Sequence, residues 1–83
     1  MLLVIAKAKI NEGKEQEFLN ITKNLIAETR KEAGCISYVL YQNTENAAEF
    51  AFVEQWESKD ALEAHGKADH FVSFQKAATG VVA

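Results

Sequence analysis

Residues 35–56 read CISYVLYQNTENAAEFAFVEQW, and this stretch determines the fold class that the sequence predicts. Its two ends, residues 35–43 and 50–56, are rich in β-branched and aromatic side chains, which is typical of strands. The polar run Thr44–Glu49 separates them and predicts a hairpin with a long loop. Side chains alternate between the two faces of a strand, and in both of these strands each face is apolar. The stretch therefore predicts neighbouring strands that need cover on both sides.

The segment before this hairpin predicts a strand and then a helix. Leu2–Ile10 alternates loosely between its two faces, as a strand does. From Lys14 to about Ala33, apolar residues recur at helical spacing, and Gly34 is a natural helix stop. A first strand, a connecting helix and the hairpin thus follow one another in the chain.

The segment after the hairpin predicts helices and the start of a last strand. Ser58 is placed to cap a helix that Gly66 weakens, and Asp69 is placed to cap a further helical stretch that Gly80 ends. Val81–Ala83 is apolar but short, which suits only the beginning of a final strand. The order predicts an α+β, ferredoxin-like split βαβ fold in one domain, residues 1–83, with an antiparallel sheet and the helices on one face.

Helices can cover only one face of that sheet, so the other would remain a large exposed apolar patch. Such patches usually mark association sites, and a chain of 83 residues is close to the size at which one core is barely sufficient. We therefore expect a homodimer that forms through the sheet face.

Charge and composition exclude several classes of partner. The net charge of -3 provides no electrostatic footprint for nucleic acid. An RNA-recognition fold shares the element order, but Glu49 and Glu54 stand where basic residues would be expected. The apolar run at residues 2–6 is too short for a signal sequence or a membrane span. We expect a cytoplasmic protein without nucleic acid or membrane partners.

The usual motifs for metal, nucleophile and cofactor chemistry are missing. His65 and His70 lie five positions apart, about 140° around a continuous helix, whereas helical metal pairs are three or four apart. Cys35 is the only cysteine, and a lone strand thiol is usually a small buried hydrophobe. No glycine-rich loop follows the first strand. We predict no metal and no cofactor.

The residues around the only tryptophan predict an apolar pocket with polar groups. Glu54 and Trp56 are two apart on a strand and point to the same side. If Trp56 faces the helices, then the helix that carries His65 and His70 crosses over it. Tyr38 lies on the neighbouring strand. A pocket of this composition suits a flat, conjugated ligand. Each of these residues taken singly is also compatible with a core or surface role.

Three motifs in order resemble the antibiotic biosynthesis monooxygenase domain. Residues 32–38 read EAGCISY, residues 50–58 read FAFVEQWES, and residues 65–71 read HGKADHF. The resemblance covers nearly the whole chain and implies a dimeric α/β barrel, in which two ferredoxin-like sheets pack face to face. In a heme-degrading branch, a strand Asn and a later helix His accompany the Trp. Here Ala6 or Ala8 and Gln75 stand at those positions, so heme is not expected.

The resemblance implies a cofactor-independent monooxygenase that acts on a quinol or a similar phenol. His65 would act as base or anion-stabilising donor, because imidazole exchanges a proton near neutral pH, and Trp56 would form the catalytic pocket wall. Substrate contacts would come from Tyr38, His70, Glu54 and Asn43. Two alternatives remain open at this point: an isomerase acting by proton transfer on a small carbonyl compound, and a non-enzymatic dimeric protein that binds a small ligand or responds to stress.

Overall fold

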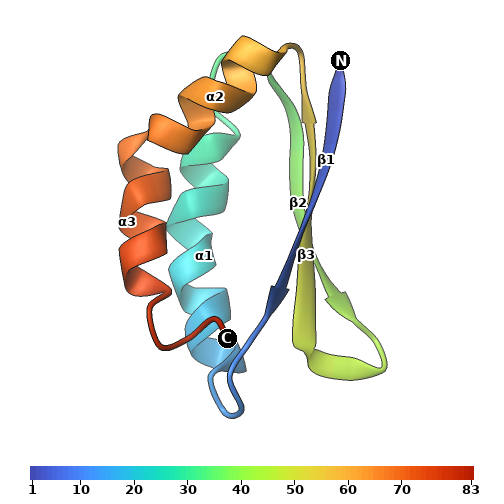
Figure 1. Cartoon of the computed structure of the whole chain (residues 1–83), viewed down its shortest axis with the longest axis vertical. Helices are drawn as coiled ribbons and strands as arrows, with labels where there is room; N and C mark the ends of the chain where they lie inside the picture. Colours follow the sequence, from blue (N-terminus) through green and yellow to red (C-terminus); the bar gives the residue numbers. More distant parts are fainter.

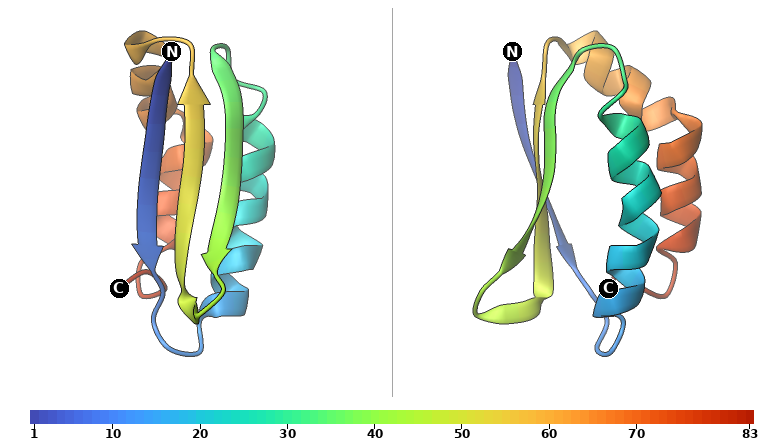
Figure 2. Two further views of the ribbon diagram at one scale, coloured as in Figure 1. Left: turned by 90° about the vertical axis from the view of Figure 1, so that its right-hand side faces the viewer. Right: turned by 180° about the vertical axis from the view of Figure 1, so that it is seen from behind.

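The computed structural model describes residues 1–83 as a three-stranded sheet covered by three helices (Figure 1). The elements are, in order, β1 (Leu2–Lys9), α1 (Glu15–Thr29), β2 (Cys35–Asn43), β3 (Asn46–Trp56), α2 (Lys59–Lys67) and α3 (Asp69–Ala77). The strands lie in the order β1-β3-β2, and both pairings are antiparallel. The helices lie on one face of the sheet and leave the other face bare (Figure 2). The predicted α+β, ferredoxin-like arrangement is confirmed.

The central strand β3 provides the middle of the core. Its alternate residues Phe50, Phe52, Glu54 and Trp56 are all buried, while the residues between them are half-buried on the other face. The period of two that governs strand side chains therefore holds along this segment. Trp56 faces the helices, which is the condition on which the expected pocket depends. Ile36 does not share the face of Tyr38, because a bulge between Cys35 and Ser37 turns it outward.

The hairpin between β2 and β3 is tighter than predicted. Asn43 pairs with Asn46, so the long loop expected at residues 44–49 is wrong. Asn43 Oδ1 accepts a hydrogen bond from the Glu45 N–H at 2.8 Å, and Asn46 Oδ1 accepts one from the Ala48 N–H at 3.1 Å. These hydrogen bonds between asparagine side chains and the backbone stabilise a tight turn. Strand β3 can therefore begin at Asn46, although few of the residues at its start favour β-strands.

Helix α1 ends at Thr29, earlier than the predicted end near Ala33, and the chain then makes a tight turn. The Glu32 N–H donates to the Thr29 carbonyl at 3.0 Å, and the Cys35 N–H donates to the Glu32 carbonyl at 3.2 Å. Gly34 has φ +85, a conformation that favours glycine. This turn places Glu32 between α1 and β2, below α2.

The segment after β3 forms two helices that meet at Ala68. Ser58 caps α2 as predicted, since its Oγ accepts a hydrogen bond from the Ala61 N–H at 3.2 Å. Ala68 has extended backbone angles of φ -68 and ψ 145, which interrupt the helix. Ala68 rather than Asp69 occupies the cap position of α3, and it makes no side-chain cap hydrogen bond. The prediction that Asp69 caps this helix is wrong.

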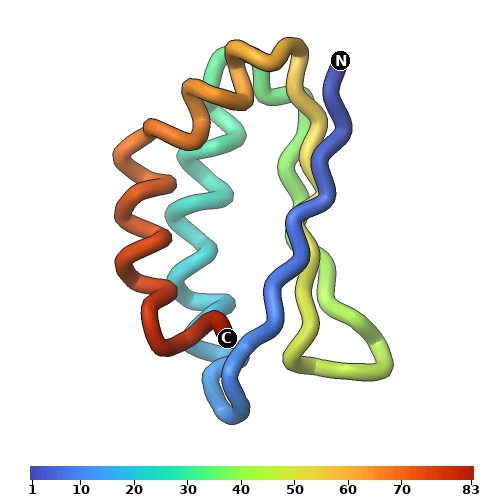
Figure 3. The backbone as a smooth tube through the Cα atoms, viewed as in Figure 1, coloured from blue at the N-terminus to red at the C-terminus, as the bar shows by residue number.

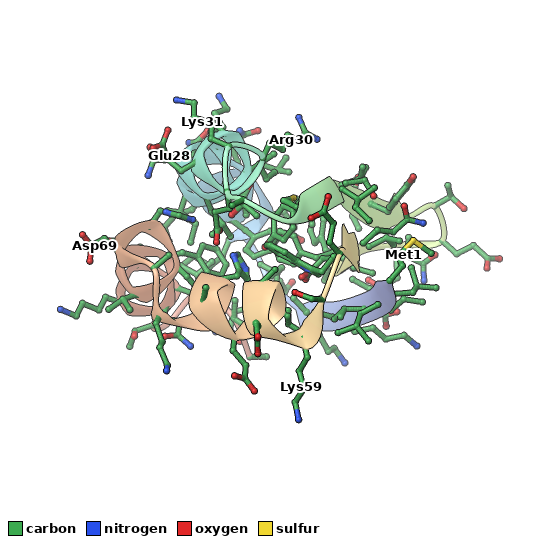
Figure 4. All side chains as sticks on the ribbon, turned by 90° about the horizontal axis from the view of Figure 1, so that it is seen from above. Met1, Glu28, Arg30, Lys31, Lys59 and Asp69 are labelled. Atoms are coloured by element: carbon green, nitrogen blue, oxygen red, sulfur yellow. The ribbon has the colours of Figure 1, made fainter.

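The end of the chain returns to the end of β1 (Figure 3). Val82 forms an isolated antiparallel bridge with Ile10, and the Ala83 N–H donates to the Lys9 carbonyl at 2.8 Å. Val81 and Ile10 are both buried there. In a view from above, side chains fill the space between helices and sheet, whereas the labelled Glu28, Lys59 and Asp69 point outward (Figure 4).

Candidate functional site

The structure brings most of the predicted site residues together at one end of the space between sheet and helices. Tyr38 comes from β2, Glu54 and Trp56 from β3, His65 from α2 and His70 from α3. Asn43 does not join them. It lies at the far end of β2, about 16 Å along the strand from Tyr38 at ~3.3 Å per residue, and donates to Glu49 Oε1 at 3.2 Å.

Glu54 and Trp56 form the buried polar pair of the site. Trp56 is fully buried, and its indole Nε1–H donates to Glu54 Oε1 at 2.9 Å. Both side chains point inward because they are two residues apart on β3. Glu54 is itself buried and stands opposite Tyr38 in the pairing with β2. The carboxylate is thus held by a neutral donor on its own strand.

Tyr38 is a buried phenol that keeps its proton. Its hydroxyl makes no hydrogen bond with the protein, while the Arg30 Nε–H donates to its backbone carbonyl at 2.9 Å. Burial raises the pKa of Tyr38 above its ordinary value, and the nearby Glu54 and Glu32 carboxylates raise it further. The side chain can therefore act as a neutral hydrogen-bond donor but not as a base.

His65 is enclosed by aromatic rings. Its ring centroid lies 4.8 Å from that of Trp56, 4.9 Å from that of Phe71 and 5.4 Å from that of Tyr38. These contacts bury the imidazole and fix the plane of its ring. Only one of its nitrogens, Nδ1, has a hydrogen-bond partner.

That partner is Glu32, a functional candidate to which the sequence analysis assigned no role. His65 Nδ1 and His70 Nε2 each lie 2.7 Å from the same oxygen, Glu32 Oε2. Glu32 is part of the EAGCISY motif, but it is separated from the two histidines by 33 and 38 residues. The only signal was its place in that motif, because no periodicity links residues so far apart.

The two histidines converge because α2 and α3 do not form a continuous helix. The expected separation of about 140° assumed one continuous helix, and this assumption is wrong. The ring centroids of His65 and His70 are only 6.2 Å apart. Glu32, His65 and His70 offer ligand atoms within 4.8 Å of one another and are the side chains that could hold a metal ion. Separations of 2.7 Å, however, fit direct N–H···O⁻ hydrogen bonds and are shorter than the ~3.3 Å between neighbouring ligands of a tetrahedral zinc ion.

A cavity of about 440 Å³ opens beside this cluster. It lies between α3 and the strands, and its wall is mostly apolar, with aromatic side chains from both layers. Polar groups in the wall come from Lys7, Tyr38, Glu54, Gln75 and Thr79. Its main lining residues are Tyr38, Phe52, Glu54, Phe71, Phe74 and Gln75. His65 does not line it directly but packs against Tyr38 and Phe71, which do.

A larger hollow of about 580 Å³ lies over the bare side of the sheet near the hairpin. It includes Lys7, Lys9, Tyr41, Asn43 and Glu49, most of them exposed. It contains none of the clustered aromatic and titratable groups described above. The smaller cavity therefore has the chemistry of a site.

Comparisons with known proteins agree with this architecture. A sequence model described as antibiotic biosynthesis monooxygenase matches residues 1–77. The crystal structure of a conserved protein from Methanosarcina mazei Go1 is 38% identical, with a TM-score of 0.91 over 96% of this chain and 79% of that one. A crystal structure described as antibiotic biosynthesis monooxygenase is 28% identical, with a TM-score of 0.93 over 99% of this chain and 86% of that one.

A protein of Synechocystis sp., "Uncharacterized protein sll1783", is 32% identical over 73 residues, which are 88% of this chain. The matched residues make up 50% of the length of that relative.

None of the helices combines the length and apolar character that crossing a membrane requires.

Proposed function

Because the chain belongs to the antibiotic biosynthesis monooxygenase family, we propose that it oxidises a quinol or a similar phenol with dioxygen and without a bound cofactor. The observation that carries this proposal is the mostly apolar cavity of about 440 Å³, whose wall includes Phe52, Phe71 and Phe74 together with Glu54 and Tyr38. Its volume lies within the range of about 300–1,000 Å³ that small-molecule sites have.

The reaction requires a dry place for an aromatic ring and a group that removes a phenolic proton. Phe52, Phe71 and Phe74 supply apolar surface for the ring, and the neutral Tyr38 phenol supplies a hydrogen-bond donor for a developing phenolate. His65 acts as the base in this proposal, and Trp56 holds Glu54 in place. The deprotonated substrate then supplies electrons to dioxygen.

The proposed overall reaction balances without an external reductant. One oxygen atom of dioxygen forms a new carbon–oxygen bond, and the other leaves as water. The two hydrogens lost from the quinol supply the electrons and protons for that water, so a quinol and dioxygen yield a hydroxyquinone and water.

We further propose that two copies of the chain associate through the bare face of the sheet. Leu3, Ile5 and Tyr41 lie on that face with exposed fractions of 60%, 58% and 57%. Val39 and Val53 pair beside Ile5 on the same face. An apolar surface of this extent is unusual for a monomer and suits a second, identical sheet.

The proposed activity is tested with a reduced naphthoquinol, such as menadiol, in aerobic and anaerobic buffer. We expect protein-dependent oxygen uptake and, with ¹⁸O₂, one labelled oxygen in the quinone product. His65→Ala should abolish this uptake, whereas Lys76→Ala, a change on the exposed side of α3, should not alter it. Absence of protein-dependent oxygen uptake with any quinol would refute the proposal. Turnover of a carbonyl compound without oxygen would instead favour an isomerase.

A further inference from the structure

Glu32, His65 and His70 form a hydrogen-bonded cluster behind the cavity, and its arrangement assigns them different roles. We propose that Glu32 is a positioning residue that fixes the tautomer of His65, and that His70 holds the Glu32 carboxylate in place. The inference deepens the proposed function, because it specifies how the base of that same site is prepared.

The hydrogen-bonding capacity of each group determines where the hydrogens of the cluster lie. A carboxylate oxygen only accepts, so His65 Nδ1 and His70 Nε2, each 2.7 Å from Glu32 Oε2, must both carry hydrogen. A neutral imidazole carries only one N–H, which leaves His65 Nε2 with its lone pair. Glu32 thereby makes Nε2 the proton-accepting nitrogen.

The surroundings of His65 Nε2 leave this nitrogen free to accept a proton. His65 Nε2 has no hydrogen-bond partner in the protein, and Thr29 Oγ1 is the only fully enclosed polar side-chain atom without a partner. Nε2 is therefore reached by solvent, although the His65 side chain is only 5% exposed. The ring packs against Tyr38 and Phe71, which line the cavity, so His65 stands directly behind the cavity wall. In the proposed reaction, the substrate reaches Nε2 between these two side chains.

The Glu32 carboxylate is held in place both by its backbone and by its hydrogen-bond donors. Glu32 lies in the turn after α1, tied by backbone hydrogen bonds to Thr29 and Cys35, and its side chain is only 14% exposed. The second N–H on the same oxygen comes from His70, whose side chain is 16% exposed. Two donors on one oxygen restrict rotation of the carboxylate, and charge-assisted hydrogen bonds of this length are strong. His70 thus supports His65 through Glu32, without a hydrogen bond to His65 itself.

The proton transfer balances within this cluster. The phenolic O–H bond of the substrate breaks, its electron pair stays on the phenolate oxygen, and a new N–H bond forms at His65 Nε2. The resulting imidazolium carries hydrogen on both nitrogens. Glu32 remains ionised and stabilises the positive charge through Nδ1–H. The proton is available at Nε2 when dioxygen is reduced to water.

The test is nitrogen NMR of ¹⁵N-histidine-labelled, metal-free protein without substrate. We expect His65 to show a protonated Nδ1 and an unprotonated Nε2. Glu32→Leu should shift the population toward the other tautomer, and Glu32→Gln should do so in part. Glu17→Gln, which changes an exposed carboxylate near the start of α1, should leave the spectrum unchanged. Retention of the same tautomer in Glu32→Leu would overturn the inference.

The role of His70 is tested by a conservative pair. Gln has an N–H donor and Leu has none, so His70→Gln should preserve the His65 tautomer and His70→Leu should randomise it. In quinol turnover, Glu32→Gln should lower kcat about 10- to 100-fold with little change in KM. Equal spectra for the two His70 variants would exclude its supporting role.

Two further outcomes separate this inference from its alternatives. Stoichiometric, tight binding of added Zn²⁺ that Glu32→Leu abolishes would overturn it in favour of a metal site. If Glu32 controls the tautomer but His65→Ala retains quinol turnover, the proposed base is wrong while the positioning effect stands. Failure of the proposed function is thus distinguishable from failure of this inference.

Discussion

Glu54 and Trp56, two residues apart on β3, are joined by a hydrogen bond of 2.9 Å from the indole Nε1–H to the carboxylate. The fully buried tryptophan is the only one in the chain, so its fluorescence reports directly on this pair. The pair connects the core of the protein to the cavity, because Glu54 also lines the cavity wall.

We expect Glu54→Leu to destabilise the protein more than Glu54→Gln. Glutamine retains an oxygen that can accept the indole N–H, whereas leucine leaves a buried donor unpaired at a cost of about 1–3 kcal/mol. The measurement is urea denaturation followed by Trp56 emission. Equal free energies of unfolding for the two variants would show that this hydrogen bond contributes little.

Gly34 and Gly13 provide a matched pair for testing the turn that carries Glu32. Both have positive φ, +85 and +81, but a Cβ at Gly34 would lie 2.5 Å from the Ala61 Cβ, and one at Gly13 would meet nothing within 4 Å. Gly13→Ala should cost about 1–2 kcal/mol of backbone strain. Gly34→Ala should cost about 1–3 kcal/mol more, because of overpacking against α2. Equal losses in denaturation experiments would contradict a close contact with α2.

The proposed dimer is tested at Ile5. We expect Ile5→Lys to convert the protein to a monomer, because it places a charge on the exposed apolar face, beside Val53 of the central strand. Val72→Lys is the control, since Val72 is an exposed apolar residue on α3 rather than on the sheet. The readout is light scattering at micromolar concentration. A wild-type mass near the chain value of 9.2 kDa would refute the dimer.

The raised pKa of Tyr38 predicts that the protein loses stability at alkaline pH. Because burial and the nearby carboxylates raise its pKa above 10.0, the unfolded chain releases this proton at a lower pH than the folded protein. The contribution of Tyr38 to the free energy of unfolding is fully present below the ordinary pKa of tyrosine. It is lost as the pH rises above that value, with a slope of up to about 1.4 kcal/mol per pH unit. Tyr38→Phe should flatten this decline in the free energy of unfolding. Tyr41→Phe, at an exposed position, should not, and an unchanged slope in Tyr38→Phe would contradict the prediction.

Filling the cavity should weaken ligand binding while the protein stays folded. Ala6 lines the cavity from β1, and Ala6→Leu would extend a larger side chain into it. We expect at least about a tenfold loss in affinity for menadione, equivalent to about 1.4 kcal/mol, measured by quenching of Trp56 emission. Ala64→Leu on the exposed side of α2 should bind as the wild type does. Unchanged affinity in Ala6→Leu would place the ligand elsewhere.

Local patterns were sufficient to predict the alternation of side chains along β3 and the cap at Ser58. Each depends on neighbours within a few positions, such as the alternation of strand side chains or a hydroxyl near a free helix N–H. The same reasoning failed at the hairpin, where Asn43 and Asn46 stabilise a tight turn within a polar run. It also extended α1 past Thr29, because periodicity does not show where tertiary contacts end a helix.

The amino-acid sequence was enough to predict the strand and helix types, since these follow from periodicity. It also predicted the grouping of Tyr38, Glu54 and the two histidines, on the condition that Trp56 faces the helices. Only the tertiary structure revealed that one oxygen of Glu32 meets both His65 and His70. These two hydrogen bonds require the turn after α1 to lie close to α2 and α3, the helices that join at Ala68. Contacts over 33 and 38 residues depend on this packing, which no local pattern encodes.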